Sequence, residues 1–480
     1  EKSTVEEKGK EEEERNKHRE EIREARKERR VMSGMAAFLS MMKGDESRST
    51  VEEEEKEKTI EQVDLSKLNR KERRALLKER GDLVQHVEEK KKEHEVRLAI
   101  RPKVTLDTVS ISSPFFVEST VFQTTLPKNG FQPVVQGNNY IRSCKFSTSG
   151  SLLATSSQDR HLRIFNFDDS EKKLSLKSEV SLGGLVYDME WHPREDWIAT
   201  TSRDHPIHLW NGHGLREASF RGINHLDELS SAVSLRFSLD GSLLYAGYNK
   251  FIRVFDLNRP GRQMREIKTW SRDQGGQRAI LSCIAVNPIF SGVFAVGCYS
   301  NSIGLYSDRS KSADCLFSIP FSALSQLEYS NDGLRLYAST RNAGSIACFD
   351  LRNPGQVLYS FEREGYTNQK FTFDLDRSDH YLFSGSSTGD LLVFDVRNGE
   401  TKAIERRKVS SSALVGLSLH PSLPVVATCS GERIYREMEL SDDEEGEEER
   451  KRRRVEGEGE RGYREGKRGM DNAVHLSSLL

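Results

Sequence analysis

The stretch from residue 203 to residue 262 alternates apolar and polar positions in short runs of strand length. Leu235 and Phe237 alternate with polar neighbours, which is the period-2 pattern of a half-buried strand. The segment SLDGS (238–242) predicts a turn in which Gly241 takes a positive φ. The runs LLYAG and FIRVFD follow on either side of a short NK turn. The pattern therefore predicts three successive strands with no helix between them.

This pattern repeats along the chain about every 45 residues, which is the spacing of four-stranded propeller blades. The predicted inner-strand segments are IRSCKF, VYDMEW, AVSLRF, ILSCIA, LSQLEY, KFTFDL and LVGLSL. Two markers recur within these segments: an apolar fourth position (Cys144, Met189, Leu235, Cys283, Leu327, Phe373, Leu417) and a sixth position that is mostly aromatic or large (Phe146, Trp191, Phe237, Ala285, Tyr329, Leu375, Leu419). A third marker is an aromatic residue later in each copy (Phe165, Trp210, Phe255, Tyr306, Phe349, Phe394, Tyr435). Together they predict an all-β fold, a seven-bladed β-propeller.

The distribution of charged residues along the chain predicts the domain organisation. We expect the propeller at 111–437, a charged and mostly disordered N-terminal region at 1–110, and a disordered mixed-charge tail at 438–480. The seventh copy is short after its aromatic marker, so we expect its outer strand to come from 115–126, which would close the ring.

The charged ends contain three further segments. VMSGMAAFLSMM (31–42) is either a partner-binding helix or a transient one, and 66–81 predicts a solvated helix whose basic face could alternatively contact RNA or serve nuclear import. Lys451, Arg452, Arg453 and Arg454 form a basic run that fits a nuclear localisation signal or a merely solvated charge run equally well.

Composition limits the remaining possibilities. The net charge is −2, so nucleic-acid binding would need a local basic surface. The six cysteines form no C-x-x-C pair, which fits a reducing compartment without disulfides. No apolar run is long enough to span a membrane.

Enzyme chemistry has no support in the residue pattern. His205 and His208 have an H-x-x-H spacing, but Pro206 lies inside it at a strand entry, where the two rings would not share a face. Asp188 and Glu190 flank a strand and read as surface residues rather than as a catalytic pair. We therefore expect no metal, no cofactor and no catalytic activity.

Binding is favoured instead, at one end of the ring. If the strands of a blade are called a to d from the axis outwards, the b–c turns and the d–a connections emerge on the same end, and the longest polar connections lie there. Arginine suits phosphates and stacks on unpaired bases, although the same residues also suit an acidic peptide. The expected RNA- or partner-binding residues are Arg203, His205, Arg221, His225, Arg272, Gln277, Arg278, Arg341, Asn368, Gln369 and Lys370.

Two aspartates of these turns have a structural interpretation. Asp159 and Asp204 occupy the position at which propeller repeats often hold an aspartate that braces the b–c turn, and we expect that role for both.

Several segments also resemble the telomerase Cajal body protein family of WD-repeat proteins. They are SRDHPIHLW, ASFRGINHLDELSSAVSLRFSLDGSLLYAGYNKFIRVF with the following RPGR, SCIAVNP and GYTNQKFTFDLDRSDHYLFSGSSTGDLLVFD. The similarity covers roughly 138–436, and NHLDEL and TNQ…FDLD are uncommon among propellers in general.

The resemblance implies a non-enzymatic protein that binds small Cajal-body RNAs, in some lineages telomerase RNA, and directs these particles with their proteins to nuclear Cajal bodies. Its distinctive segments fall on the end selected above. We expect the propeller to be monomeric and to have no membrane partner. The competing interpretation is a general protein-interaction scaffold, such as a ligase adaptor or a peptide reader, bound through the same end.

Overall fold

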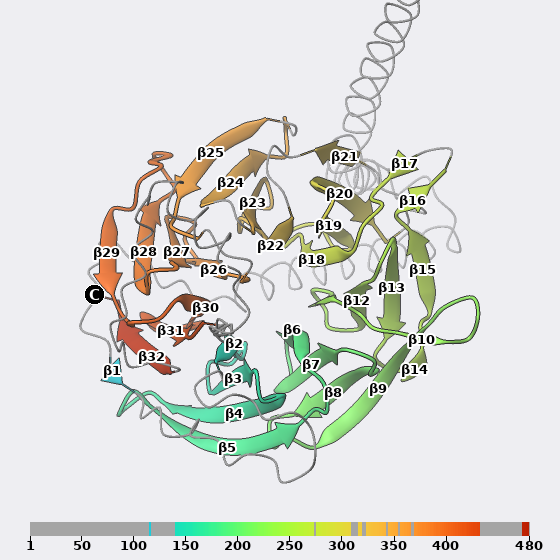
Figure 1. Cartoon of the computed structure of the whole chain (residues 1–480), viewed down its shortest axis with the longest axis horizontal. Coiled ribbons are helices and arrows are strands. Elements are labelled where there is room, and N and C mark those ends of the chain that lie inside the picture. Colours follow the sequence, from blue (N-terminus) through green and yellow to red (C-terminus); the bar gives the residue numbers. More distant parts are fainter. Residues whose placement is uncertain are drawn as a thin grey trace, which may run out of the picture.

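Seven blades of antiparallel strands form a ring in the computed structural model (Figure 1), and their innermost strands line a central channel. The structure describes residues 115–116, 140–272, 275–308, 315–318, 323–341, 344–353, 356–365, 369–432 and 473–479. No helix occurs among them, so the predicted seven-bladed propeller is confirmed. The region 1–110, Asn368, Tyr435 and the basic run at 451–454 lie outside the described residues.

Blades one to three run in chain order from the channel outwards. They contain β2 (Ile141–Phe146), β3 (Leu152–Ser157), β4 (His161–Asp168) and β5 (Lys173–Ser181); β6 (Val186–Trp191), β7 (Trp197–Ser202), β8 (Ile207–Asn211) and β9 (Arg216–Ile223); and β11 (Ser234–Phe237), β12 (Leu243–Gly247), β13 (Phe251–Asp256) and β15 (Arg265–Lys268). Short strands β10 (Leu229–Ser230) and β14 (Gly261–Arg262) pair with β9, and β16 (Trp270–Ser271) pairs with β17 (Gly275–Gly276).

Blades four to six repeat the same order. They contain β18 (Leu281–Val286), β19 (Val293–Cys298), β20 (Ser302–Ser307) and β21 (Cys315–Ser318); β22 (Leu324–Tyr329), β23 (Arg335–Thr340), β24 (Ser345–Asp350) and β25 (Val357–Glu362); and β26 (Phe373–Leu375), β27 (Tyr381–Gly385), β28 (Asp390–Asp395) and β29 (Glu405–Lys408).

The hydrophobic core lies between neighbouring blades. Leu235 and Phe237, the fourth and sixth positions of blade three, pack against Ala199, Leu209 and Phe220 of blade two. Except in blade four, the same positions of the other inner strands also pack against the preceding blade, because side chains of one strand alternate between its two faces. The period-2 pattern of the sequence is therefore the pattern of the interfaces between blades.

The predicted register of blade four is wrong by one residue. Cys283 pairs with Gly297 after a bulge, as Ser143 pairs with Ser156 in blade one, so Ile284 and Val286 occupy the positions assigned to Cys283 and Ala285. The segment LSCIAV is buried at all six positions and has no polar alternation that would mark its register. The five cysteines with described side chains are all buried free thiols: Cys144, Cys283, Cys298, Cys348 and Cys429.

Tight turns bring consecutive blades into contact. Gly241 has a φ of 82°, as its turn requires, and its carbonyl lies 3.1 Å from His192 Nε2 of the preceding blade. A Cβ at this position would lie 2.2 Å from that nitrogen. Glycine is therefore needed at position 241 for both its backbone conformation and the close approach of the neighbouring blade.

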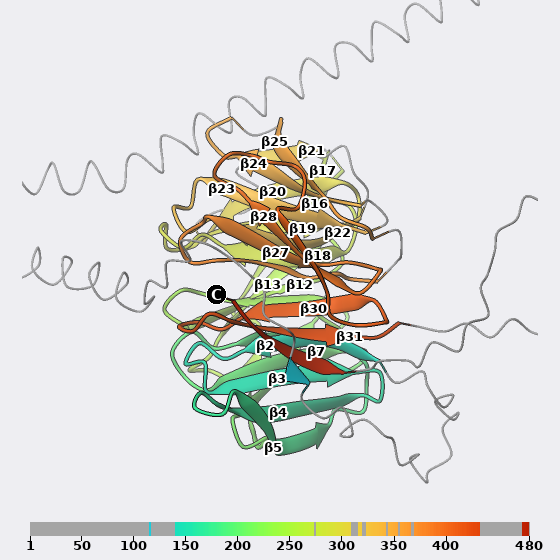
Figure 2. The same ribbon diagram turned by 90° about the vertical axis from the view of Figure 1, so that its left-hand side faces the viewer.

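Both ends of the chain complete the seventh blade. Its order is β30 (Leu414–Leu419), β31 (Val425–Ser430), β32 (Val474–Ser478) and β1 (Phe115–Phe116), and β1 lies beside β32 in the side view (Figure 2). The predicted outer strand within 115–126 is confirmed at its first residues. The predicted disordered tail is wrong for 473–479, because this short alternating segment supplies the third strand of the blade. The segment follows a long charged stretch, so the composition of the tail did not indicate a strand.

A charge introduced into β32 should open the ring. Leu476 is 1% exposed and pairs with Ala427 and Phe115. We expect Leu476→Asp to lower the free energy of unfolding by about 4 kcal/mol, because it removes apolar burial and buries an unpaired carboxylate. Thermal unfolding followed by circular dichroism measures the effect. Leu358→Asp, at a 41% exposed position of β25, is the matched control. An equal, small change in both variants would show that β32 does not close the ring.

Candidate functional site

The b–c turns and the d–a connections lie together on one end of the ring, here called the rim. The backbone N–H of Asp204, in a b–c turn, donates to Ser231 Oγ in the connection after β10 at 2.8 Å. The N–H of Lys250, in the next b–c turn, donates to the carbonyl of Ala279 at 3.3 Å. The segments that contain His225, Arg278 and Lys370 are all d–a connections, so the structure brings them to the same end.

Several predicted binding residues are accessible on this rim. Arg203 pairs with Asp204 at 3.3 Å, with both side chains more than two thirds exposed. Arg221, His225, Arg272 and Arg278 are exposed, and His205 is half-buried with its Nδ1 2.6 Å from the carbonyl of Arg203. His208 instead contacts Ser219 Oγ at 2.9 Å, and no group of three potential metal ligands occurs among the described residues.

Gln277 is not an accessible binding residue, and its prediction is corrected. Its side chain is fully buried, and its amide donates to the carbonyls of Val296 and Ser302 at 2.9 and 3.0 Å. Its Oε1 accepts from the Tyr306 hydroxyl at 2.7 Å. The residue therefore holds the connection against blade four and has no group left for a ligand.

The last predicted residues of the rim lie deeper than expected. Lys370 enters the channel, where its Nζ is 3.5 Å from Asp188 Oδ1 across the ring. Gln369 donates to the carbonyl of Gly431 at 3.4 Å and is half-buried. Both residues therefore contribute to the packing of the rim end of the channel.

The two aspartates assigned to bracing differ from each other. Asp159 accepts from Arg163 at 2.6 Å and from the N–H of His161 at 3.1 Å, so it holds its b–c turn. The side chain of Asp204 is 79% exposed and pairs with its neighbour Arg203, which corrects the expected bracing role. Position in the repeat was not sufficient, because the bracing bond also needs a cation on the following strand.

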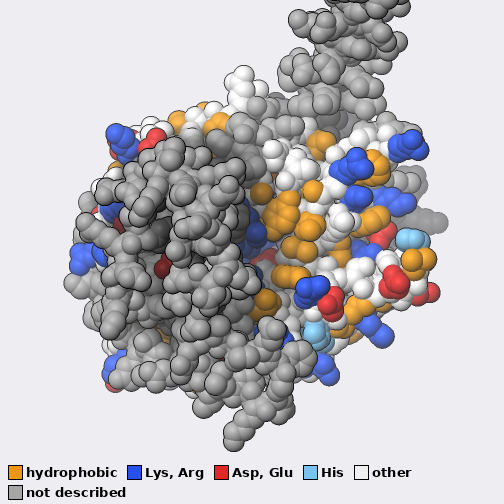
Figure 3. All heavy atoms as spheres, in the orientation of Figure 1, with side chains coloured by type: hydrophobic (Ala, Val, Ile, Leu, Met, Phe, Trp, Pro, Cys, Tyr) orange, Lys and Arg blue, Asp and Glu red, His pale blue; other side chains and the backbone are white. Residues whose placement is uncertain are grey.

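The structure also shows rim residues that the sequence did not single out. The Trp270 ring is contacted by Lys250 Nζ at 5.5 Å and by Arg278 Cζ at 5.2 Å from its centroid. One blade further, Arg341 Cζ lies 5.1 Å from the Tyr299 centroid. We call these five residues the basic–aromatic arc. Basic and hydrophobic side chains are also intermingled on the part of the ring that holds β12 to β17 (Figure 3).

The cations of the arc are not neutralised by carboxylates. Neither Lys250, Arg278 nor Arg341 forms an ion pair with any acidic side chain that the structure describes, and the same holds for Arg272. By contrast, Arg406 on the edge of blade six pairs with Glu364 at 2.9 Å and with Asp390 at 2.6 Å. The arc is therefore a surface whose positive charge remains available to an anionic partner.

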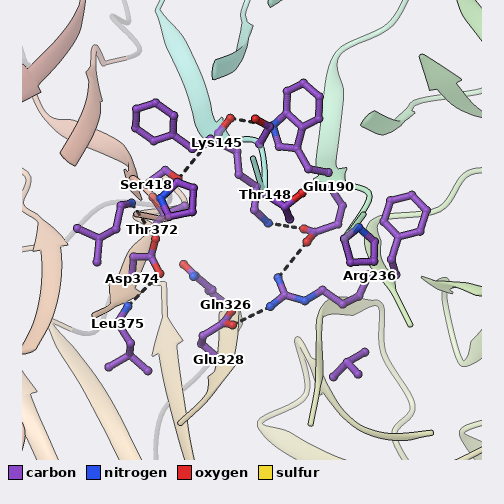
Figure 4. A pocket seen from close by; sticks show the side chains of 18 of the residues that line it. Lys145, Thr148, Glu190, Arg236, Gln326, Glu328, Thr372, Asp374, Leu375 and Ser418 are labelled. Atoms are coloured by element: carbon purple, nitrogen blue, oxygen red, sulfur yellow. Dashed lines mark hydrogen bonds and ion pairs between the residues drawn. The ribbon is translucent and has the colours of Figure 1, made fainter. Parts of the chain in front are cut away.

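The central channel is a second candidate site, with a volume of about 1460 Å³. Arg236 pairs with Glu190 at 3.4 Å and with Glu328 at 2.7 Å, and Lys145 also pairs with Glu190 (Figure 4). Burial alone would raise the pKa of Glu190, but Arg236 and Lys145 lower it below its usual range. The charges of the channel therefore compensate one another.

Asp374 is an exception within this network. Its Oδ2 accepts from the N–H of Leu419 at 2.9 Å, but it forms no ion pair with a described cation. Burial raises its pKa to about 6. The ionised carboxylate is therefore less stable in the folded protein than in the unfolded chain.

Comparison with known proteins shows what the chain is similar to. A family model for the WD domain, G-beta repeat, matches residues 131–166 and 176–211. Proteins named telomerase Cajal body protein 1 are 36% identical over 336 residues in Bos taurus (66% of this chain, 62% of that protein) and 37% identical over 330 residues in Homo sapiens (64% and 60%). The chain resembles telomerase Cajal body protein 1. The resemblance seen in NHLDEL and TNQ…FDLD is thus confirmed.

The similarity extends to a protein with another name. A Schizosaccharomyces pombe protein named guanine nucleotide-binding protein negative regulator 1 is 28% identical over 338 residues, which are 64% of this chain and 83% of that protein. The chain spans about three fifths of the length of the telomerase Cajal body protein 1 relatives. In the part of the chain that the structure describes, no helix is long and apolar enough to cross a membrane.

Loss of the Gln277 amide should destabilise the fold. We expect Gln277→Leu to lower the free energy of unfolding by about 2 kcal/mol, because it leaves buried carbonyls and the Tyr306 hydroxyl without partners. Urea unfolding measures this change. Arg278→Leu, at the exposed next position, should leave the midpoint almost unchanged, and a larger effect at 278 than at 277 would contradict the assignment.

Asp374 should make stability depend on pH. Since its folded pKa is raised, stability decreases as pH rises from about 4 towards 6 and stays lower above that range. We expect Asp374→Asn to raise the unfolding midpoint at pH 7.5 but not below about pH 4.

Asp350 provides a control of opposite sign. A hydrogen bond from Arg352 lowers its pKa, so Asp350→Asn should destabilise the protein at pH 7.5. A midpoint for Asp374→Asn that differs equally from wild type at both pH values would rule out the titration.

Proposed function

We propose that this protein is a non-enzymatic propeller that binds small Cajal-body RNAs, and in some organisms telomerase RNA, through its rim. We further propose that it directs these particles, with their associated proteins, to Cajal bodies in the nucleus. The printed names of the relatives from Bos taurus and Homo sapiens support the link to telomerase and Cajal bodies. RNA as the ligand is what the resemblance to this family implies, and the chemistry of the rim supports it.

The observation that carries the proposal is the uncompensated charge of the basic–aromatic arc. Lys250, Arg272, Arg278 and Arg341 lie on neighbouring connections of one face, and two aromatic rings lie among them. Proteins that bind single-stranded nucleic acid commonly combine positively charged side chains with aromatic side chains. A rigid propeller holds them in place, since the connections are anchored to strands at both ends.

A protein-interaction scaffold is the second candidate function. The Schizosaccharomyces pombe relative is named as a negative regulator of a guanine nucleotide-binding protein, which is a protein partner. Leu226 and Met264 are 64% and 58% exposed near the edge of blades two and three, where a protein could bury them. Such a scaffold would recover protein partners after nuclease treatment and would enrich no class of RNA.

Charge reversal on the rim should abolish RNA recovery. We expect the double variant Arg278→Glu, Arg341→Glu to lose at least about 10-fold of the RNA crosslinked to the full chain in nuclei, because phosphate contacts become repulsive. Sequencing of the crosslinked RNA measures both the yield and the RNA class.

The control is Arg194→Glu, an exposed residue of the a–b turn on the opposite end of the ring. It should retain wild-type recovery. Unchanged recovery in the double variant, with a normal circular dichroism spectrum, would remove the rim from RNA binding.

A further inference from the structure

We propose that Arg278 and Arg341 form two guanidinium platforms on which unpaired bases of a single-stranded RNA segment stack. This inference rests on the proposed RNA-binding function and concerns how the rim contacts the bases. It also assigns a stacking role to two particular side chains rather than a general attraction to phosphate.

Each guanidinium is held by an aromatic ring. Arg278 lies 5.2 Å from the centroid of Trp270, and Arg341 lies 5.1 Å from that of Tyr299. Contact with a half-buried ring restricts the orientation of the planar group before any ligand binds, so less conformational entropy is lost on binding. The side chain of Arg278 is exposed. It can therefore present planar surface to solvent while the ring holds it.

The charge of both groups is left for a ligand. Among the described residues neither arginine has a carboxylate partner, and Arg341 Nε is buried without a hydrogen-bond partner. A structural arginine of a propeller behaves differently, as Arg163 shows by pairing with Asp159 at 2.6 Å and with Glu179 at 2.7 Å. The two arc arginines therefore contribute little to ionic cross-linking of the fold.

The platforms lie on adjacent connections. The carbonyl of Ala279 accepts from the N–H of Lys250 at 3.3 Å, and the carbonyl of Ile280 accepts from the N–H of Tyr299 at 3.1 Å. The residues directly after Arg278 thus contact the turns that carry Lys250 and Tyr299, and the Tyr299 ring in turn contacts Arg341. One short strand of RNA could contact both platforms, with Lys250 positioned for its phosphates.

The geometry favours unpaired bases over other anionic ligands. Bases in a duplex are stacked on each other and cannot reach a guanidinium plane, whereas loop nucleotides can. An acidic peptide would bind the N–H edge of the guanidinium and leave its flat face unused. The buried amide of Gln277 cannot read base edges, so stacking rather than hydrogen-bond readout should dominate here.

Substitution by lysine separates stacking from charge. We expect Arg278→Lys and Arg341→Lys each to weaken binding of a synthetic RNA hairpin with a single-stranded loop by about 10-fold, because lysine retains the charge but lacks the planar group. The slope of affinity against salt should stay unchanged, since no phosphate contact is lost. Fluorescence anisotropy with the purified full chain measures both quantities.

Arg194→Lys is the matched control, because Arg194 is exposed on the opposite end of the ring and forms no cation–π contact among the described residues. It should bind as wild type does, and a blunt duplex of the same stem should bind weakly to all variants. If Arg341→Lys lowers the thermal midpoint, Arg278→Lys alone decides the question.

Three outcomes would overturn the platforms while leaving RNA binding intact: wild-type affinity in both lysine variants, equal affinity for loop and duplex, or an effect that disappears at high salt. A wild-type chain that binds neither RNA would instead contradict the proposed function itself.

Discussion

The ring depends on hydrogen bonds between channel-facing side chains and the backbone of the next inner strand. Asp188 accepts from the N–H of Leu235 at 2.9 Å, and Gln326 bonds both the N–H and the carbonyl of Phe373 at 3.0 and 2.8 Å. Without these bonds, the polar side chains and the backbone groups of neighbouring inner strands would lack these hydrogen-bond partners within the protein. In blades two and five the third position of the inner-strand segment thereby ties the blade to the next one, and apolar packing fills the space behind it.

Closure places the same requirement on the last interface. Ser418 Oγ of blade seven, at the fifth position of its segment, accepts from the N–H of Phe146 in blade one at 3.1 Å, so a side-chain-to-backbone hydrogen bond also crosses this junction. The blade itself is held by antiparallel pairing of β31 with β32, and of β32 with β1. Segments more than 300 residues apart must therefore meet before the seventh interface can form, and contacts of such high sequence separation are slow to form.

Local patterns predicted the fold well, because each blade interface uses the same alternation. They failed where burial is uniform or where a contact is made with a distant segment. LSCIAV is apolar on both faces, so its register could not be read. Val474 and Leu476 alternate correctly, but only their pairing with β31 distinguishes them from a charged tail.

The binding site was less predictable for the same reason. Polar connections on one end were expected to bind, yet the identity of a residue does not state which way its amide or guanidinium points. Gln277 and Arg278 are neighbours in the chain, and one is fully buried while the other is exposed. Trp270 was missed because its importance comes from Lys250 and Arg278, which reach it from different segments.

The distribution of charge argues for the rim rather than the channel as the place where a large ligand binds. In the channel, Glu190 lies between Lys145 and Arg236, and Asp188 meets Lys370, so a charged ligand would have to break existing pairs. These pairs are partly buried, and breaking one leaves a charge without its partner. On the rim the arginines rest on aromatic rings, which orient them without neutralising them. An anion that binds there gains attraction and loses no ion pair within the described structure.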